Sequence, residues 1–134
     1  MIYVIDASAM IAYLRAEPGG QVVRDLLQDT AHQCLAHAIN FCEVYYDFYR
    51  ADGAELAGAA VRDLWRAGIA CREDLSPSFW QSAGALKAVQ RRISLADCFA
   101  ITLAGNLGGA LVTADHHEFD PLAASGRCAI SFIR

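Results

Sequence analysis

The chain has 134 residues, of which 55% are hydrophobic and 19% charged, and its formal net charge at pH 7 is −4. This length suits one domain with a real core, and the composition is too apolar for a disordered chain. No apolar run reaches the roughly 18 residues that a membrane-spanning helix needs, because Asp97, Asn106 and the pair Gly108-Gly109 interrupt the longest candidate.

The negative total argues only weakly against a nucleic-acid partner. Ten of the eleven cations are Arg, whose guanidinium group matches phosphate oxygens. The five cysteines are widely spaced and contain no CxxC motif, which argues against a disulfide framework or a zinc site. Together with the lack of a signal-peptide pattern, this predicts a cytoplasmic protein with reduced thiols.

The chain begins with a strand-like run and two helix-like segments. Residues 1–5 are apolar and β-branched, which predicts a strand buried on both faces. Residues 8–16 favour a helix that stops before a breaker cluster at 17–20. Residues 21–29 repeat apolar pairs four positions apart, which suits a second, short helix.

The middle of the chain repeats this alternation. Residues 33–37 are a weak strand candidate, and 40–51 favour a helix rich in aromatic residues. Residues 54–68 are good helix formers that end at a glycine, and 69–73 are a short strand candidate.

The last third contains two more helices and two more strands. Ser76-Pro77 has the pattern of an N-cap followed by Pro at the first helical position, for a helix that ends near Gln90. Residues 94–106 carry leucine and phenylalanine four apart, which predicts another helix. Residues 110–113 and 128–133 are the final strand candidates.

Strands that alternate with helices predict parallel strands joined by helical crossovers. We therefore expect one domain over residues 1–134, in the α/β class, folded as a three-layer α/β/α sandwich with a mainly parallel central sheet. In such sheets, function gathers where the strands reach their carboxyl ends.

Four acids fall at positions that this fold brings to that edge. Asp6 ends the first strand, and Asp115 follows the strand at 110–113. Glu43 and Asp97 lie in the first turns of two helices that start at the same edge. We expect these four carboxylates to converge.

Helix capping is the alternative role for each acid. Ser94-x-x-Asp97 and Asn40-x-x-Glu43 match the capping-box spacing, and the other two acids can cap the helices that follow them. The conjunction of all four favours a shared role, because carboxylates gathered at one edge repel one another unless a cation lies between them.

The donor type predicts which cation that is. Carboxylates with hydroxyl helpers suit Mg²⁺ or Mn²⁺ rather than zinc. Ser8 and Thr113 each lie two residues from an acid and can orient a carboxylate, or else bond only to nearby backbone. Such ions lower the pKa of a bound water, and no Ser/His or Cys/His base is evident, so the pattern indicates phosphodiester hydrolysis.

Five segments resemble one known family. They are "VIDASAM" at 4–10, "AEPGG" at 16–20, "INFCEVYYDF" at 39–48, "ISLADCFAITLA" at 93–104 and "LVTADHHEFD" at 111–120. Their order and spacing across nearly the whole chain resemble PIN domains, most closely the VapC-like toxins of bacterial toxin–antitoxin pairs.

The resemblance implies a metal-dependent ribonuclease with Mg²⁺, or Mn²⁺ as substitute. It places the catalytic and metal-binding acids at Asp6, Glu43, Asp97 and Asp115 and supporting groups at Ser8, Asn40 and Thr113. Asp120, or alternatively Glu118, falls where a fifth acid sometimes occurs. The resemblance also implies an RNA substrate, a cognate antitoxin and a homodimer.

Three cations are candidates for contact with RNA phosphates or the antitoxin: Arg15, Arg91 and Arg92. The alternative for each is a solvated position near a helix C-terminus.

The sequence thus predicts the toxin of a toxin–antitoxin pair, an endoribonuclease that hydrolyses RNA phosphodiester bonds. A phosphatase on a similar sheet fits less well, because Ser8 occupies the position where that class generally has a second Asp. The alternative from another class is a non-catalytic PIN-fold module that binds RNA or protein. Such a module is expected to have lost part of the acidic quartet, which here is complete.

Overall fold

The computed structural model describes residues 1–117, 119 and 126–134. Short strands and helices alternate over these residues, as the sequence pattern predicts. The strands are β1 (Ile2–Ile5), β2 (Gln33–His37), β3 (Ile69–Arg72), β4 (Ala110–Thr113) and β5 (Ala129–Phe132). The helices are α1 (Ala7–Leu14), α2 (Gly20–Gln28), α3 (Ala38–Asp52), α4 (Ala54–Ala67), α5 (Pro77–Val89) and α6 (Leu95–Asn106).

The strands form one sheet in the order β3-β2-β1-β4-β5, and every neighbouring pair is parallel. β1 lies at the centre, where Val4 pairs with Leu35 of β2 and Ile5 pairs with Val112 of β4. The crossovers from β1 to β2, from β2 to β3 and from β3 to β4 run through helices, as is usual between parallel strands. The α/β class predicted from the sequence is confirmed.

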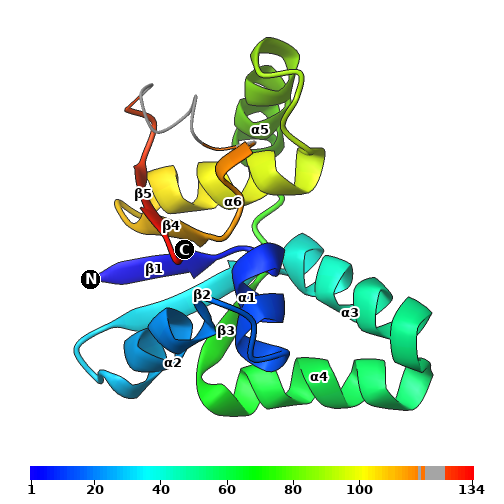
Figure 1. Cartoon of the computed structure of the whole chain (residues 1–134). Coiled ribbons are helices and arrows are strands. Elements are labelled where there is room, and N and C mark those ends of the chain that lie inside the picture. The colour runs from blue at the N-terminus through cyan, green and yellow to red at the C-terminus, as the bar shows by residue number, and fades with distance from the viewer. Residues whose placement is uncertain (118, 120–125) are drawn as a thin grey trace.

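Helices cover both faces of the sheet (Figure 1). Successive residues of β1 face opposite sides, so Ile5 belongs to the core under α1 to α4, and Val4 belongs to the core under α5 and α6. Figure 1 also shows α3 and α4 as a hairpin of helices that projects from the sheet. The three-layer α/β/α arrangement is confirmed.

Most helix boundaries agree with the sequence signals. Ser76 caps α5, with Pro77 at the first helical position, and Ser94 caps α6 through a bond from the backbone N–H of Asp97. For α3 the proposed cap at Asn40 is wrong. The helix begins at Ala38, and the Nδ1 atom of His37 accepts the backbone N–H of Ile39 instead. Asn40 is therefore a helical residue whose side chain serves another purpose.

The sheet order creates a switch point between β1 and β4. The chain leaves β1 through α1 on one face of the sheet and enters β4 from α6 on the other face. The carboxyl ends of β1 and β4 therefore lie side by side where the chain changes faces. Such crevices are the usual place for ligands in open α/β sheets. Asp6 and Asp115 follow these two strands.

All five cysteines are free, and two of them, Cys34 and Cys98, are buried. None of the helices in the described part of the chain is long and apolar enough to cross a membrane.

Candidate functional site

Asp6 lies at the centre of the site and is almost fully buried, with 1% of its surface exposed. It caps α1: its Oδ1 atom accepts the backbone N–H of Ala9 at 2.9 Å and the hydroxyl of Ser8 at 2.7 Å. Its Oδ2 atom accepts the hydroxyl of Thr113 at 2.5 Å. Capping, one of the two roles considered for Asp6, is thus present and still leaves its carboxylate at the β1–β4 crevice.

The two hydroxyls also hold the loop that follows β4. The Ser8 Oγ atom accepts the backbone N–H of Ala114 at 3.0 Å, and the Thr113 Oγ1 atom accepts that of Asp115 at the same distance. The hydroxyl oxygens themselves are 3.2 Å apart. Ser8 and Thr113 therefore link Asp6 directly to the backbone of the Asp115 loop.

Burial raises the pKa of Asp6 from 3.8 to about 6. The hydrogen bonds from Thr113, Ala9 and Ser8 act in the opposite direction, and the Glu43 carboxylate raises the pKa further by repulsion. Asp6 and Glu43 are therefore close enough to interact electrostatically. None of the described Lys, Arg or His side chains forms an ion pair with Asp6.

Glu43 and Asp97 lie on two helices that one buried amide connects. The Asn40 Nδ2 atom donates to the Glu43 Oε1 atom at 3.1 Å and to the backbone oxygen of Ala96 at 3.4 Å. Glu43 projects from α3, and Asp97 lies in the first turn of α6 next to Ala96. Both acids are partly exposed.

The four predicted acids thus belong to elements that begin or end at the carboxyl edge of the sheet, with Asp6 buried and the other three partly exposed. Over residues 1–117, 119 and 126–134, however, no three His, Cys, Asp or Glu side chains form a group placed to hold a metal ion.

The chemistry of these residues fits a hard divalent cation. The oxygen ligands are those that Mg²⁺ and Mn²⁺ prefer, and hydroxyls fix the orientation of the innermost carboxylate. Asp6 is a buried acid without a cationic partner among the described residues. A cation bound beside it would offset the unfavourable free energy of burying its negative charge.

The three predicted contact arginines have different surroundings. Arg15 lies at the end of α1, where its guanidinium group pairs with Asp47 of α3 at 3.2 Å and lies 4.2 Å from the ring centre of Phe48. It therefore ties α1 to α3. Arg91 and Arg92 are exposed between α5 and α6, just before the turn that carries Asp97. The predicted fifth acid, Asp120 or Glu118, lies outside the described residues.

His116 was not among the predicted site residues, yet it fixes the end of the Asp115 loop. Its ring stacks on Phe132 with 3.9 Å between the ring centres, and its Nε2 atom bonds the backbone oxygen of Arg134 at 2.6 Å. The sequence gives no signal for this contact, because it depends on β5 lying next to β4.

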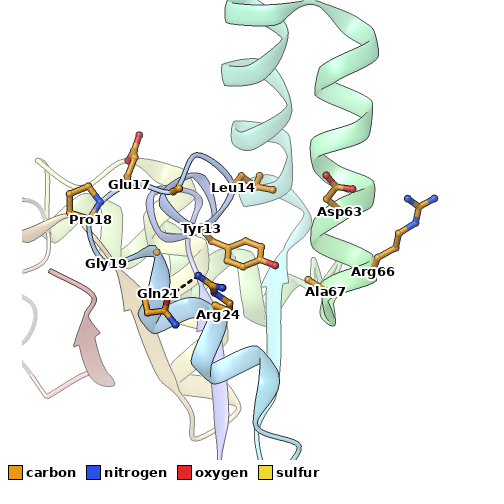
Figure 2. A pocket seen from close by; sticks show the side chains of 12 residues that line it. Tyr13, Leu14, Glu17, Pro18, Gly19, Gln21, Arg24, Asp63, Arg66 and Ala67 are labelled. Carbon is orange, nitrogen blue, oxygen red and sulfur yellow. Dashed lines mark hydrogen bonds between the residues drawn. The ribbon is translucent and has the colours of Figure 1, made fainter.

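A surface pocket of about 940 Å³ lies between the α1–α2 turn and α4, and none of the four acids lines it. Figure 2 shows the Tyr13 ring between α1 and α4, with Arg24 near Gln21 on α2 and Arg66 and Asp63 on α4. The Arg24 side chain donates to the Gln21 side chain at 2.7 Å. No local motif predicts this pocket, because three separate helices build it.

Comparison with solved structures finds the same fold in toxin–antitoxin complexes. VapBC-1 from nontypeable Haemophilus influenzae matches with a TM-score of 0.73 and 16% identity, over 99% of this chain and 98% of that one. VapBC2 from Rickettsia felis, bound to a DNA fragment from its promoter, matches with a TM-score of 0.74 and 15% identity, over 98% of each chain. DNA-bound VapBC from Salmonella typhimurium matches with a TM-score of 0.73 and 15% identity, over 100% of this chain and 99% of that one.

Comparison with curated protein sequences finds no match. The sequence profile described as the PIN domain matches residues 3–124, which include all four acids, the strands β2 to β4 and all of β1 except Ile2. Since this match covers most of the chain and the architecture agrees with it, the protein belongs to the PIN domain family.

Proposed function

We propose that this PIN domain is a Mg²⁺- or Mn²⁺-dependent endoribonuclease of the VapC type, the toxin of a toxin–antitoxin pair. Its family and its likeness to VapC-containing complexes support the proposal. The complete acidic quartet favours it over a non-catalytic PIN-fold module that binds RNA or protein.

One observation carries the proposal. A buried carboxylate, Asp6, lies at the β1–β4 switch point with its oxygens held by two hydroxyls and with a second carboxylate, Glu43, near enough to raise its pKa. Burial of an acid without a cation destabilises a fold. A buried acid of this kind is typical of a functional site, where a residue required for ligand binding is kept although it lowers the stability of the fold.

In this proposal Asp6, Glu43, Asp97 and Asp115 hold the divalent cation. When bound, the cation supplies a water of lowered pKa and neutralises charge at the phosphodiester. Ser8 and Thr113 keep the Asp6 oxygens from rotating by donating to one oxygen each.

The substrate and partners follow from the same proposal. Arg91 and Arg92 lie exposed beside the turn that carries Asp97, where they can bind RNA phosphates on one side of the cleavage point. A cognate antitoxin is proposed from the likeness to VapBC complexes. A cytoplasmic homodimer is also proposed, with the exposed Tyr45 and Tyr49 of α3 and Trp65 of α4 as apolar surface.

The test is cleavage of total cellular RNA by the purified protein with Mg²⁺, Mn²⁺ or EDTA. We expect cleavage only with a divalent ion, and a loss of roughly 100-fold or more in Asp97→Asn, since removal of a metal ligand exceeds the 10- to 100-fold effect of losing an outer-shell partner. Mapping the cut sites then identifies the preferred RNA.

Asp25→Asn is the matched control, because it makes the same change at an exposed acid of α2. It should cleave like the original protein. Equal cleavage by Asp97→Asn would indicate a contaminating nuclease and refute the assignment. RNA binding without cleavage, under every ion tested, would favour the non-catalytic module.

A further inference from the structure

Asn40 has a fully buried side-chain amide in which the nitrogen forms hydrogen bonds and the oxygen does not, within the described residues. Its exposed surface is 0%, and its Nδ2 atom donates to Glu43 within α3 and to the Ala96 oxygen of α6. Its Oδ1 atom is buried and has no hydrogen-bond partner among the described residues. The side chain thus donates twice, to Glu43 and to Ala96, while its acceptor is unsatisfied within the described part of the chain.

Such an acceptor is unfavourable for the fold. A buried polar atom without a partner has lost its hydrogen bonds to water and gained none in return, and native proteins contain few examples. Phe41 and Val44 of the same helix, and Ala96 of α6, whose oxygen accepts from the amide, are all buried apolar residues, so an apolar side chain at position 40 would suit the core better than an amide. The presence of an amide at this buried position indicates a need for its donors.

The donors join two helices that carry predicted site acids. Glu43 is partly exposed and has three side-chain torsions, so without a partner its carboxylate samples several positions. The bond from Asn40 restricts it, while the bond to Ala96 ties the same amide to the residue before Asp97. A serine or threonine hydroxyl has one hydrogen and cannot make both bonds, and an aspartate has none to donate at neutral pH.

We propose that Asn40 is a positioning residue, which sets the Glu43 carboxylate at a fixed distance from the first turn of α6 so that Glu43 and Asp97 can share one divalent cation. The inference rests on the proposed function. Asn40 touches neither substrate nor cation in it, and acts through Glu43.

The first test measures Mn²⁺ affinity without RNA, by electron paramagnetic resonance, and cleavage of RNA in parallel. Asn40→Ala should bind Mn²⁺ roughly 10-fold or more weakly, in the range found for partners that orient a metal ligand. Thr102→Ala is the matched control, since it removes another buried polar group, a hydroxyl that donates to the Cys98 oxygen within α6 and to none of the four acids. It should bind Mn²⁺ like the original protein.

The second test needs no metal. In a ¹H–¹⁵N spectrum, the side-chain amide protons of Asn40 should exchange with solvent at least roughly 10-fold more slowly than those of the exposed Asn106, because they are buried and bonded. Glu43→Ala should shift the Asn40 side-chain resonances, while Asp25→Ala should not.

The outcomes separate the two proposals. An unshifted Asn40 resonance in Glu43→Ala, or Mn²⁺ binding within twofold of the original protein in folded Asn40→Ala, overturns the positioning role even if the protein is a nuclease. Original protein that neither binds Mn²⁺ nor cleaves RNA overturns the proposed function and the positioning role with it, whatever the spectrum shows of the amide bridge.

Discussion

At the scale of single residues, Asp6 has two opposite effects on the stability of the fold. Its hydrogen bonds cap α1 and fix the loop after β4, while its burial disfavours the charged form. The pKa of Asp6 rises from its ordinary value of 3.8 to about 6 in the folded protein. At a pH between these two values, Asp6 therefore binds a proton in the folded protein more readily than in the unfolded chain. The free energy of unfolding therefore falls as pH rises from about 4 to 6.

Asp6→Asn should therefore stabilise the metal-free protein at pH 7. The neutral amide still caps α1 and can bond to Thr113. It has no charge to bury, and the raised pKa of Asp6 means that burying the charge lowers the free energy of unfolding by a value on the order of 3 kcal/mol. Urea unfolding in EDTA at pH 5 and pH 7 measures the effect. The original protein should lose stability between the two pH values, and the variant should lose less.

The exposed Asp25 provides the comparison, since Asp25→Asn should change stability by no more than about 0.5 kcal/mol. A less stable Asp6→Asn at pH 7 would mean that the three hydrogen bonds to the charged form outweigh its burial.

Residue identity and spacing were enough to predict Asp6, Ser8 and Thr113 as neighbours, because strand ends in a parallel sheet meet at one edge. They were not enough for Asn40, which matched a capping pattern but lies inside α3. His37 can cap that helix because a ring nitrogen accepts the N–H that an Asn oxygen would otherwise take.

At the scale of elements, the turn between α1 and α2 depends on close approach of two backbones. A Cβ atom at Gly20 would lie 2.5 Å from the Ala12 oxygen and 3.2 Å from the Tyr13 Cα atom. Both contacts are with backbone, so a side chain at this position forces the helices apart. The packing of α2 against α1 also shapes the pocket in Figure 2.

Gly20→Ala should destabilise the protein by about 1–3 kcal/mol, the range for overpacked cores. Gly84→Ala is the matched control: that glycine lies exposed inside α5, and a Cβ atom there meets nothing within 4 Å. It should stabilise the protein by about 0.5–1 kcal/mol through reduced chain entropy. Thermal unfolding of both variants tests the pair, and similar effects in both would contradict the close-approach argument.

Local signals sufficed for the elements themselves. Breakers such as Gly68 and caps such as Ser76 and Ser94 mark helix ends by short-range chemistry that the rest of the fold does not alter. The tie from Arg15 to Asp47 could not be foreseen, because it joins helices whose crossing depends on how each packs on the sheet.

At the scale of the whole molecule, the sheet order places β1 between strands that are distant in sequence. No local pattern specifies β3-β2-β1-β4-β5, although alternation of strands and helices was enough for a three-layer prediction. The order matters because it puts Asp6 between the ends of β2 and β4, within reach of groups from both sides.

Divalent ions should stabilise the whole fold in a pH-dependent way if the proposed function holds. Binding at 100 times the dissociation constant adds about 2.7 kcal/mol to the free energy of unfolding. Protons compete for Asp6 below its pKa of about 6, so Mn²⁺ should raise the melting temperature more at pH 7.5 than at pH 5.

Differential scanning fluorimetry at fixed Mn²⁺ concentration measures this difference. Asp6→Asn should lose most of the Mn²⁺ effect at both pH values. An equal rise at pH 5 and pH 7.5, or an undiminished rise in the variant, would place the ion elsewhere on the protein.

The hydrogen bond between Thr113 and Asp6 joins residues 107 positions apart. During synthesis on a ribosome, Asp6 leaves the exit tunnel long before Thr113 has been added to the growing polypeptide. A partly translated chain therefore lacks the hydroxyl that orients Asp6 and the acid that follows β4. The centre is complete only after residue 115 has been added, so any activity that depends on it is withheld from shorter nascent chains.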